Sequence, residues 1–505
     1  MTRLRAALVA ALLTLLAIAP QAAGAGTWDG KERRALRAYA VDTWASFEAM
    51  VYPSTGLPAD KVDAAGNRSI QTSPTNIATY MWSTLAARDL QIITPREARA
   101  RLAQTLDTLS RVERHEWSGM YYNWYDAETG AKLRTWPEPP HNQVAPFLSE
   151  VDNGWLAAAL MMVDRAVPQL REEARALHSS MDFGFFYDPA AGLMRGGFWD
   201  EPPPECNVPG NYRGRGPTVY YTCHHYGSFN TEPRIGSYIA IAKGQVPATH
   251  YFKGWRTFPD TCDWSWQEMK PEGVWRTYLG VDVFEGTYKY AGMRIVPSWG
   301  GSMFEALMVP LLVPEEQWGT RSWAINHPLY VEAQIHHGLD EAEYGYWGFS
   351  PSNNPAGGYR EYGVDPIGLN PDGYTSDQER TTVDYGFPPC RPGQPEPTAY
   401  GQGVVTPHAA FLALDFAPDA ALLNIRNLQT NFKGLYGWGG FFDSVNVRTR
   451  QFSPYYLALD QGMIMAAIAN ELRNDRLQHY FSHGQVARAL RPLMAMEEFM
   501  AGPAA

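Results

Sequence analysis

Apolar residues recur along most of the chain at the three-to-four-residue spacing that places them on one face of an α-helix. In the first such segment, Leu36, Tyr39, Trp44, Phe47 and Val51 share a face. The same pattern predicts about a dozen helical segments along the chain. They cover residues 32–51, 74–90, 95–112, 153–167, 169–181, 231–244, 302–313, 326–339, 406–416, 419–432, 455–472 and 483–496.

These segments alternate in character. Segments such as 96–112 and 168–180 are amphipathic and charged, whereas 153–165 and 455–471 are apolar almost all round. A helix that is apolar on every side must be enclosed by other elements. The alternation therefore predicts two concentric rings of helices, an all-α (α/α)6 barrel with long loops and minor β-hairpins.

Two long segments rich in Gly, Pro and Tyr, 200–230 and 347–400, interrupt the helical pattern. Loops of this length in a compact domain are usually functional or disordered. Short β-hairpins are expected within the loops, for example near residues 434–445. Because no low-complexity linker divides the chain, we predict that residues 26–505 form a single domain.

The first residues have the pattern of a secretory signal peptide. Arg3 and Arg5 precede a short apolar run, and Ala23 and Ala25 provide a small-residue cleavage site. We predict that residues 1–25 are removed, which makes the mature chain secreted or periplasmic and free of the membrane. The alternative is that this segment is retained as an anchor.

Four cysteines are present, and export would allow them to form disulfides. Four cysteines allow three pairings, and the sequence does not choose among them. Cys206 and Cys223 flank a Gly/Pro-rich loop, which favours that pair, with Cys262 and Cys390 as the second. Their spacing does not resemble a zinc site.

Charge and aromatic content narrow the class of partner. The net charge is -11 and Lys and Arg are not clustered, which argues against nucleic acid or anionic lipid as a partner. Aromatic residues make up 13% of the chain. They are explained either by sugar-stacking surfaces or by a large aromatic core.

Acidic residues lie at the ends of several apolar helical segments. Asp152, Glu232, Glu305 and Asp460 all occupy such positions. A charge beside an apolar helix is costly unless it is hydrogen-bonded or functional. Asp152 and Glu232 are candidate N-caps, since a helix N-terminus favours a carboxylate. Because four acids occupy equivalent places, a shared site explains them better than four separate helix caps do.

Six motifs in this order resemble the glycoamylase-like domain of bacterial proteins that act on β-1,2-glucan, including endo-β-1,2-glucanases and a domain of cyclic β-1,2-glucan synthases. The resemblance implies an (α/α)6 barrel that acts on glucan without a cofactor. The motifs are TSPTNIATYMWS (72–83), YYNWYD (121–126), SEVDNGWLAAAL (149–160), EPRIGSYIAIAKGQVPATHYF (232–252), PSWGGSMFEALMVPLL (297–312) and YLALDQG (456–462).

The resemblance also implies roles for individual residues. Glu232 corresponds to the general acid of the glucanases, and Asp152 and Asp460 line the catalytic pocket. Together these three are the predicted catalytic residues, with the identity of the general base left open. The predicted substrate-binding residues are Asp126, Trp124, Glu150, Asn153, Arg234, Trp299, Glu305 and Trp347.

The sequence therefore predicts a secreted, monomeric glycoside hydrolase that cleaves β-1,2-glucan by general acid/base catalysis with inversion, either as an endo-glucanase or by releasing sophorose. The alternatives are a transglycosylase, a hydrolase of another polysaccharide and a non-catalytic carbohydrate-binding relative. Asp365, Asp372 and Asp384 lie in a segment longer than in relatives and are alternative bases. No metal is assigned to the loop histidines His224, His225 and His408.

Overall fold

The structure, a computed structural model, describes residues 28–259, 269–369 and 403–504. The predicted signal peptide, the Cys262–Cys390 pair and the alternative bases Asp372 and Asp384 lie outside the described residues. Among the helices within these ranges, none combines the length and the apolar character needed to cross a bilayer.

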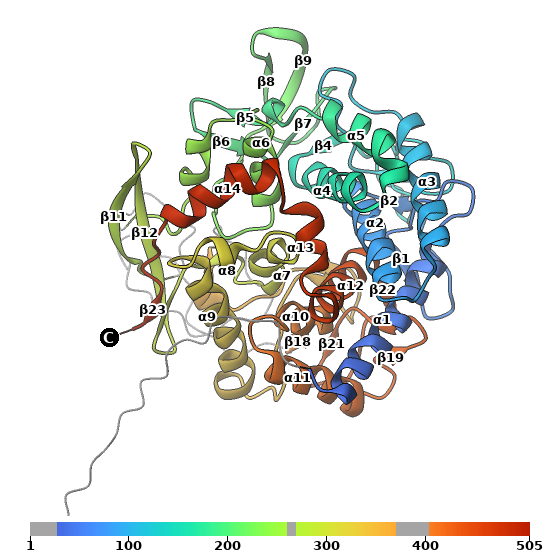
Figure 1. Cartoon of the computed structure of the whole chain (residues 1–505), viewed down its shortest axis with the longest axis vertical. Coiled ribbons are helices and arrows are strands. Elements are labelled where there is room, and N and C mark those ends of the chain that lie inside the picture. Colours follow the sequence, from blue (N-terminus) through green and yellow to red (C-terminus); the bar gives the residue numbers. More distant parts are fainter. Residues whose placement is uncertain (1–27, 260–268, 370–402, 505) are drawn as a thin grey trace, which may run out of the picture.

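Six helices form an inner ring (Figure 1). Helix α2 packs against α4 and α12, α4 packs against α6, and α10 packs against both α7 and α12. Almost every residue of α2 and α12 is buried, as are 11 of the 17 residues of α4, as expected for enclosed helices. The inner helices are α2 (Pro74–Asp89), α4 (Glu150–Ala166), α6 (Arg234–Ala242), α7 (Met303–Leu307), α10 (Pro407–Leu412) and α12 (Ala458–Arg473).

Further helices surround this ring and bury one face each. Helix α1 packs on α2 and α12, α5 on α4, α9 on α7, α11 on α10, and α14 on α6. The predicted double ring of helices is therefore present. The outer helices are α1 (Gly30–Met50), α3 (Pro95–Arg111), α5 (Arg171–Ser180), α8 (Glu315–Trp318), α9 (Trp323–His336), α11 (Pro418–Asn431), α13 (Arg476–Phe481) and α14 (Gln485–Met496).

The prediction of an all-α fold is not confirmed, because the loops between helices form many short strands. Two four-stranded sheets have the orders β4-β7-β9-β8 and β11-β12-β13-β23. The longest hairpin, β11–β12, turns at Leu279 and Gly280, both of which have positive φ, as a two-residue hairpin turn requires. The predicted hairpin near 434–445 is present as β19–β20.

The strands are β1 (Lys61–Asp63), β2 (Gln71–Thr72), β3 (Tyr125–Asp126), β4 (Phe147–Ser149), β5 (Tyr187–Asp188), β6 (Leu193–Arg195), β7 (Gly197–Trp199), β8 (Asn207–Tyr212), β9 (Arg215–Thr222), β10 (His225–Tyr226), β11 (Glu272–Tyr278), β12 (Val281–Tyr290), β13 (Met293–Ile295), β14 (Ser298–Trp299), β15 (Ser352–Asn353), β16 (Tyr359–Arg360), β17 (Gly368–Leu369), β18 (Val404–Val405), β19 (Tyr436–Gly437), β20 (Gly440–Phe441), β21 (Val445–Asn446), β22 (Tyr455–Leu457) and β23 (Gly502–Pro503).

The predicted disulfide between Cys206 and Cys223 is confirmed. Its sulfur atoms are 2.11 Å apart and its Cα atoms 5.7 Å apart. The two cysteines directly flank the β8–β9 hairpin, so the bond closes the base of that hairpin.

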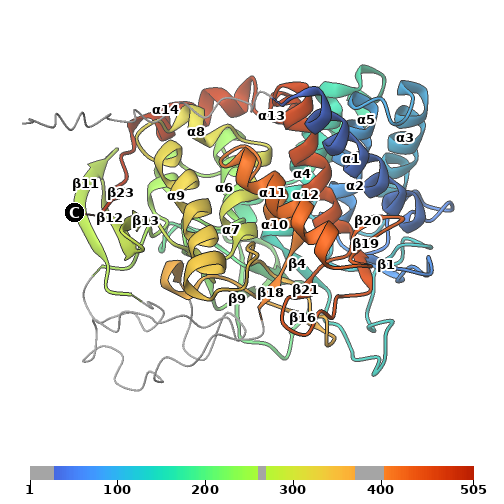
Figure 2. The same ribbon diagram turned by 90° about the horizontal axis from the view of Figure 1, so that it is seen from below.

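One end of the barrel collects the segments that lead into the inner helices. Strand β4 runs directly into α4, and β22 runs directly into α12. Strands β4, β16, β18 and β21 lie at this end, with α13 and α14 at the other (Figure 2). Side chains in the first turns of the inner helices are therefore brought to the same end of the molecule.

Candidate active site

The acids identified in the sequence lie at the N-terminal ends of inner helices. Glu150 opens α4, and Glu305 and Asp460 lie in the first turns of α7 and α12. The N-caps of α4 and α7 are serines: Ser149 accepts from the backbone N–H of the third helical residue, and Ser302 does the same. The capping interpretation of Asp152 is therefore wrong, because Ser149 takes that role.

Glu232 and Glu305 form a close pair at the start of α6. The backbone N–H of Glu232 donates to Glu305 Oε2 over 3.0 Å, and the Thr231 hydroxyl donates to the same oxygen. The indole N–H of Trp155 donates to Glu232 Oε2 over 2.8 Å. Burial, followed by the charge of Glu305, raises the pKa of Glu232 well above its ordinary value.

Arg234 holds the segments that carry these two acids. Its guanidinium makes a bidentate ion pair with Glu315, at 2.8 and 2.9 Å. Its other N–H groups donate to the backbone oxygens of Thr231, Glu305 and Ala306. Since all five donors are used and the residue is only 4% exposed, Arg234 has no donor left for a sugar in this structure. Arg234 instead ties α6 to α7.

Glu150 lies deeper than the pocket rim at which a substrate-binding residue was expected. Its side chain is fully buried, and neither carboxyl oxygen has a hydrogen-bond partner among the described residues. It packs against Gly236 of α6, where an added Cβ would come within 2.0 Å of Glu150 Oε1. Burial, followed by the charge of Asp152, raises the pKa of Glu150 well above its ordinary value. A neutral Glu150 therefore fits this position.

Asp152 is half-buried on the same first turn of α4. Its Oδ1 accepts a 2.6 Å hydrogen bond from the Thr75 hydroxyl at the start of α2. Burial raises the pKa of Asp152, and the charge of Asp152 in turn raises the pKa of Glu232. The same four acids, Glu150, Asp152, Glu232 and Glu305, all raise the pKa of the Tyr226 hydroxyl, so they form one electrostatic cluster.

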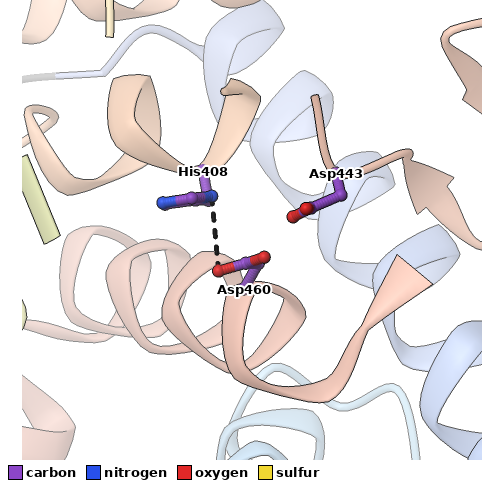
Figure 3. A group of neighbouring side chains, drawn as sticks. All are labelled: His408, Asp443 and Asp460. Atoms are coloured by element: carbon purple, nitrogen blue, oxygen red, sulfur yellow. Dashed lines mark ion pairs between the residues drawn. The ribbon is translucent and has the colours of Figure 1, made fainter. Parts of the chain in front are cut away.

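A second cluster joins His408, Asp443 and Asp460 (Figure 3). His408 Nδ1 lies 3.4 Å from Asp460 Oδ1, and Asp443 Oδ2 accepts from the backbone N–H of Asn353 over 2.5 Å. Burial raises the pKa of Asp443 to about 6. Burial, followed by the charge of Asp443, raises the pKa of Asp460 well above its ordinary value. Burial lowers the pKa of His408 to about 3, so the imidazole is neutral.

Asp443 was not among the residues predicted from the sequence. The signal available was an acid directly after the apolar pair Phe441-Phe442, in a segment taken only as a hairpin. Such an acid is buried in the fold, at 2% exposure, and its partner Asp460 is equally buried. The pairing itself depends on tertiary structure, because Asp443 lies in a loop and Asp460 in a helix.

Tyr359 on β16 connects the two clusters. Its side chain is 53% exposed. Burial of the hydroxyl end, then the charges of Asp460, Asp443 and Glu232, raise its pKa well above the ordinary value. One hydroxyl thus lies within electrostatic reach of both acid clusters. Asp152 and Asp460 lie in the first turns of α4 and α12, and Glu232 lies two residues before α6, so all three are at the N-terminal ends of inner helices.

Three other predicted binding residues have structural roles instead. Asn153 is buried and uses its amide to hold Tyr121 through both backbone groups. Asp126 Oδ1 accepts from the backbone N–H groups of the two residues at the turn that follows, Glu128 and Thr129. Trp347 is buried in the core. Contact between these side chains and a sugar is therefore not supported by their positions.

Trp124 and Trp299 remain candidates for sugar contact because both are half-buried. The Trp124 ring packs edge-on against Trp136, with centroids 5.0 Å apart. Trp299 lies on β14 and packs against a small apolar cluster that also contacts Trp255. The alternative base Asp365 is buried in a short helical turn, Asp365–Ile367.

Two family models match the sequence. Residues 268–485 match the family Glycoamylase, described as "Putative glucoamylase", and residues 38–185 match DUF3131, a family of unknown function. The chain is 27% identical over 338 residues to the cyclic β-(1,2)-glucan synthase NdvB of Rhizobium meliloti (strain 1021), which covers 64% of this chain and 9% of that protein.

The chain is also 27% identical over 143 residues to the exo β-1,2-glucooligosaccharide sophorohydrolase (non-reducing end) of Parabacteroides distasonis, covering 28% of this chain and 18% of that protein. It thus spans a small part of the length of both relatives.

An endo-β-1,2-glucanase from Chitinophaga pinensis, solved with sophorotriose and glucose, superimposes with a TM-score of 0.61 at 16% identity, over 91% of this chain and 98% of that one. That likeness establishes a shared fold. Together with the sequence matches, it confirms the resemblance seen in the motifs: the chain contains a glycoamylase-family region and is related to the proteins of β-1,2-glucan metabolism.

Proposed function

We propose that this protein is an exported glycoside hydrolase that cleaves β-1,2-glucan. The observation that carries the proposal is the meeting of two carboxyl clusters, one around Glu232 and one around Asp460, at the Tyr359 hydroxyl. Glycoside cleavage needs one carboxylic acid that donates a proton to the leaving oxygen. It also needs one carboxylate that either activates a water or attacks the sugar carbon. The related glucanase and sophorohydrolase support β-1,2-glucan as the substrate.

Glu232 is the proposed general acid. Burial and the neighbouring Glu305 favour its protonated form, which a proton donor near neutral pH requires. The Trp155 indole fixes the direction of the carboxyl group through Oε2. Asp152 adds negative charge nearby and so helps to keep the proton on Glu232.

The Asp443–Asp460 pair is the proposed base. Two buried carboxyl groups side by side do not both ionise readily, so the pair holds one negative charge over a wide pH range. The backbone N–H of Asn353 favours that charge on Asp443. Inversion is the proposed stereochemical outcome; it requires about 6.5–9.5 Å between the acid and the base, so that a water fits between them.

Aromatic side chains near the acids are the proposed sugar contacts. Tyr359 presents a half-exposed ring beside both clusters, and Trp124 and Trp299 are half-buried. Aromatic faces of this kind bury apolar surface while their polar groups remain hydrogen-bonded. The Cys206–Cys223 disulfide supports export, since such bonds persist in oxidising compartments.

The substrate is tested by incubating the purified chain with linear β-1,2-glucan and separating the products by chromatography. We expect oligosaccharides of the sophorose series, with parallel incubations on β-1,3- and β-1,4-glucan giving none. Release of sugars only from another linkage would contradict the substrate assignment.

A transglycosylase is the second candidate, because 338 residues of the chain match a cyclic β-1,2-glucan synthase at 27% identity. The same chromatograms separate the two reactions. A hydrolase consumes one water per cleavage and increases the number of reducing ends, whereas a transglycosylase leaves that number unchanged and forms longer or cyclic products.

A further inference from the structure

Asp443, Asp460 and His408 direct their polar atoms at one another from three separate segments of the chain (Figure 3). Asp443 precedes β21, Asp460 lies in the first turn of α12, and His408 lies in α10. One ligand atom from each residue lies within 4.8 Å of the others. All three side chains are buried, none being more than 2% exposed.

Within the part of the chain that the structure describes, four inward-facing atoms have no hydrogen-bond partner outside the group: His408 Nδ1, Asp443 Oδ1 and both carboxyl oxygens of Asp460. Burying such atoms without partners is costly, and two facing carboxylates repel each other unless a proton or a cation lies between them. The group therefore needs something positive at its centre.

The outward-facing atoms of His408 and Asp443, by contrast, are held in place. His408 Nε2 lies 3.0 Å from the Ser350 hydroxyl, and Asp443 Oδ2 accepts from the backbone N–H of Asn353. Metal-binding histidines and carboxylates are typically oriented in this way, with the atom remote from the metal hydrogen-bonded to the protein. Each of these two side chains has one atom fixed and another directed inward.

We propose that His408, Asp443 and Asp460 bind one divalent transition-metal ion. An imidazole nitrogen with two carboxylates suits Zn²⁺, Mn²⁺ or Fe²⁺, whereas Ca²⁺ prefers a shell made only of oxygen. Three protein ligands leave a coordination position for water. The site shares Asp443 and Asp460 with the proposed base, but its occupancy is measured directly as binding and needs no glucan turnover.

The test uses the full chain, purified without a histidine tag and stripped with EDTA. Zn²⁺ is titrated by calorimetry, Ca²⁺ is titrated in parallel, and the zinc retained after desalting is measured by mass spectrometry. We expect one Zn²⁺ per chain and no matching Ca²⁺ uptake. Wild-type protein that retains no zinc would overturn the proposal and leave a shared proton as the positive group.

Substitutions locate the ion. His408→Gln and Asp443→Asn should each weaken Zn²⁺ binding by more than about 100-fold, since changes to outer-shell partners alone cost about 10–100-fold. The control is His336→Gln, because His336 Nδ1 lies 3.3 Å from Asp340 Oδ2 in an exposed pair on the outer ring. Equal zinc binding by His408→Gln and the wild type would refute the site.

A spectroscopic measurement on the wild type covers the case in which these variants do not fold. X-ray absorption of the zinc-loaded protein should show one nitrogen from imidazole and carboxylate oxygens at about 2.0–2.2 Å. A shell without imidazole would contradict the proposal. If zinc binds and glucan turnover is unchanged, the metal site stands, but Asp443 and Asp460 are not the catalytic base. The two proposals can therefore fail separately.

Discussion

At the scale of single residues, the chemistry of Glu232 depends on neighbours that come from other helices. Trp155 on α4 donates to its carboxyl group, and Glu305 on α7 supplies the charge that favours its protonated form. The motif around Glu232 was sufficient to identify it as an acid of interest. Its partners could not be predicted, because 77 positions separate Trp155 from Glu232 along the chain.

Burial also explains why some predicted substrate-binding residues have their polar groups occupied within the protein. Arg234 and Asn153 lie in the motifs and carry polar groups, which made them plausible sugar ligands. In the structure their hydrogen-bonding groups are used by the backbone and by Glu315. A sequence shows that a side chain is polar but not whether its donors are already occupied.

Replacing Trp155 by Phe tests the environment of Glu232. The indole hydrogen bond favours the charged carboxylate and lowers the pKa of Glu232. Without it the pKa rises, the acid stays protonated to higher pH, and the alkaline limb of the kcat profile should move to higher pH. The measurement is the pH dependence of kcat for glucan hydrolysis.

The matched control for this variant is Trp82→Phe. Trp82 packs edge-on against Trp155 but donates its indole N–H to the backbone oxygen of Gly462. This control should leave the alkaline limb in place. An unchanged limb in Trp155→Phe, or equal shifts in both variants, would be inconsistent with the role given to Trp155.

At the scale of elements, the helical periodicity predicted the helices well, whereas most strands within the loops were not predicted. Helices α2 and α12 were predicted within a few residues of their observed bounds. The predicted helix 302–313 is divided, because α7 ends at Leu307 and a short turn that contains Pro310 follows. Strands β11 and β12 were missed, although β12 begins with the alternation of a half-buried strand, in which Val281 and Val283 are buried and Asp282 is exposed.

The ion pair between Arg234 and Glu315 leads to a prediction about the stability of α6. Arg234→Met would leave Glu315 charged and buried, so the free energy of unfolding should fall by about 3–5 kcal/mol. Urea denaturation followed by circular dichroism measures this loss.

An exposed ion pair provides the comparison for that variant. Arg111 pairs with Asp107 on the surface of α3, and Arg111→Met should cost about 0–1 kcal/mol. If the two variants were equally stable, Arg234 would not be the residue that holds α6 to α7.

At the scale of the whole molecule, the ring arrangement creates the site. The inner helices present their N-terminal turns at one end of the barrel, and the acids from positions 152 to 460 lie in or beside these turns. The alternation of apolar and amphipathic segments predicted this double ring. It did not predict that the acids would divide into two clusters, since that depends on which loops lie beside each helix.

The kcat of Glu232→Gln on linear β-1,2-glucan tests the central claim most directly. Glutamine keeps the shape of the side chain and its contact with Trp155 but has no proton to give to the leaving oxygen. We predict a fall in kcat of about 10²–10⁴-fold, whereas Glu173→Gln, an exposed change on α5, should leave kcat unchanged. A folded Glu232→Gln protein with the kcat of the wild type would contradict the account.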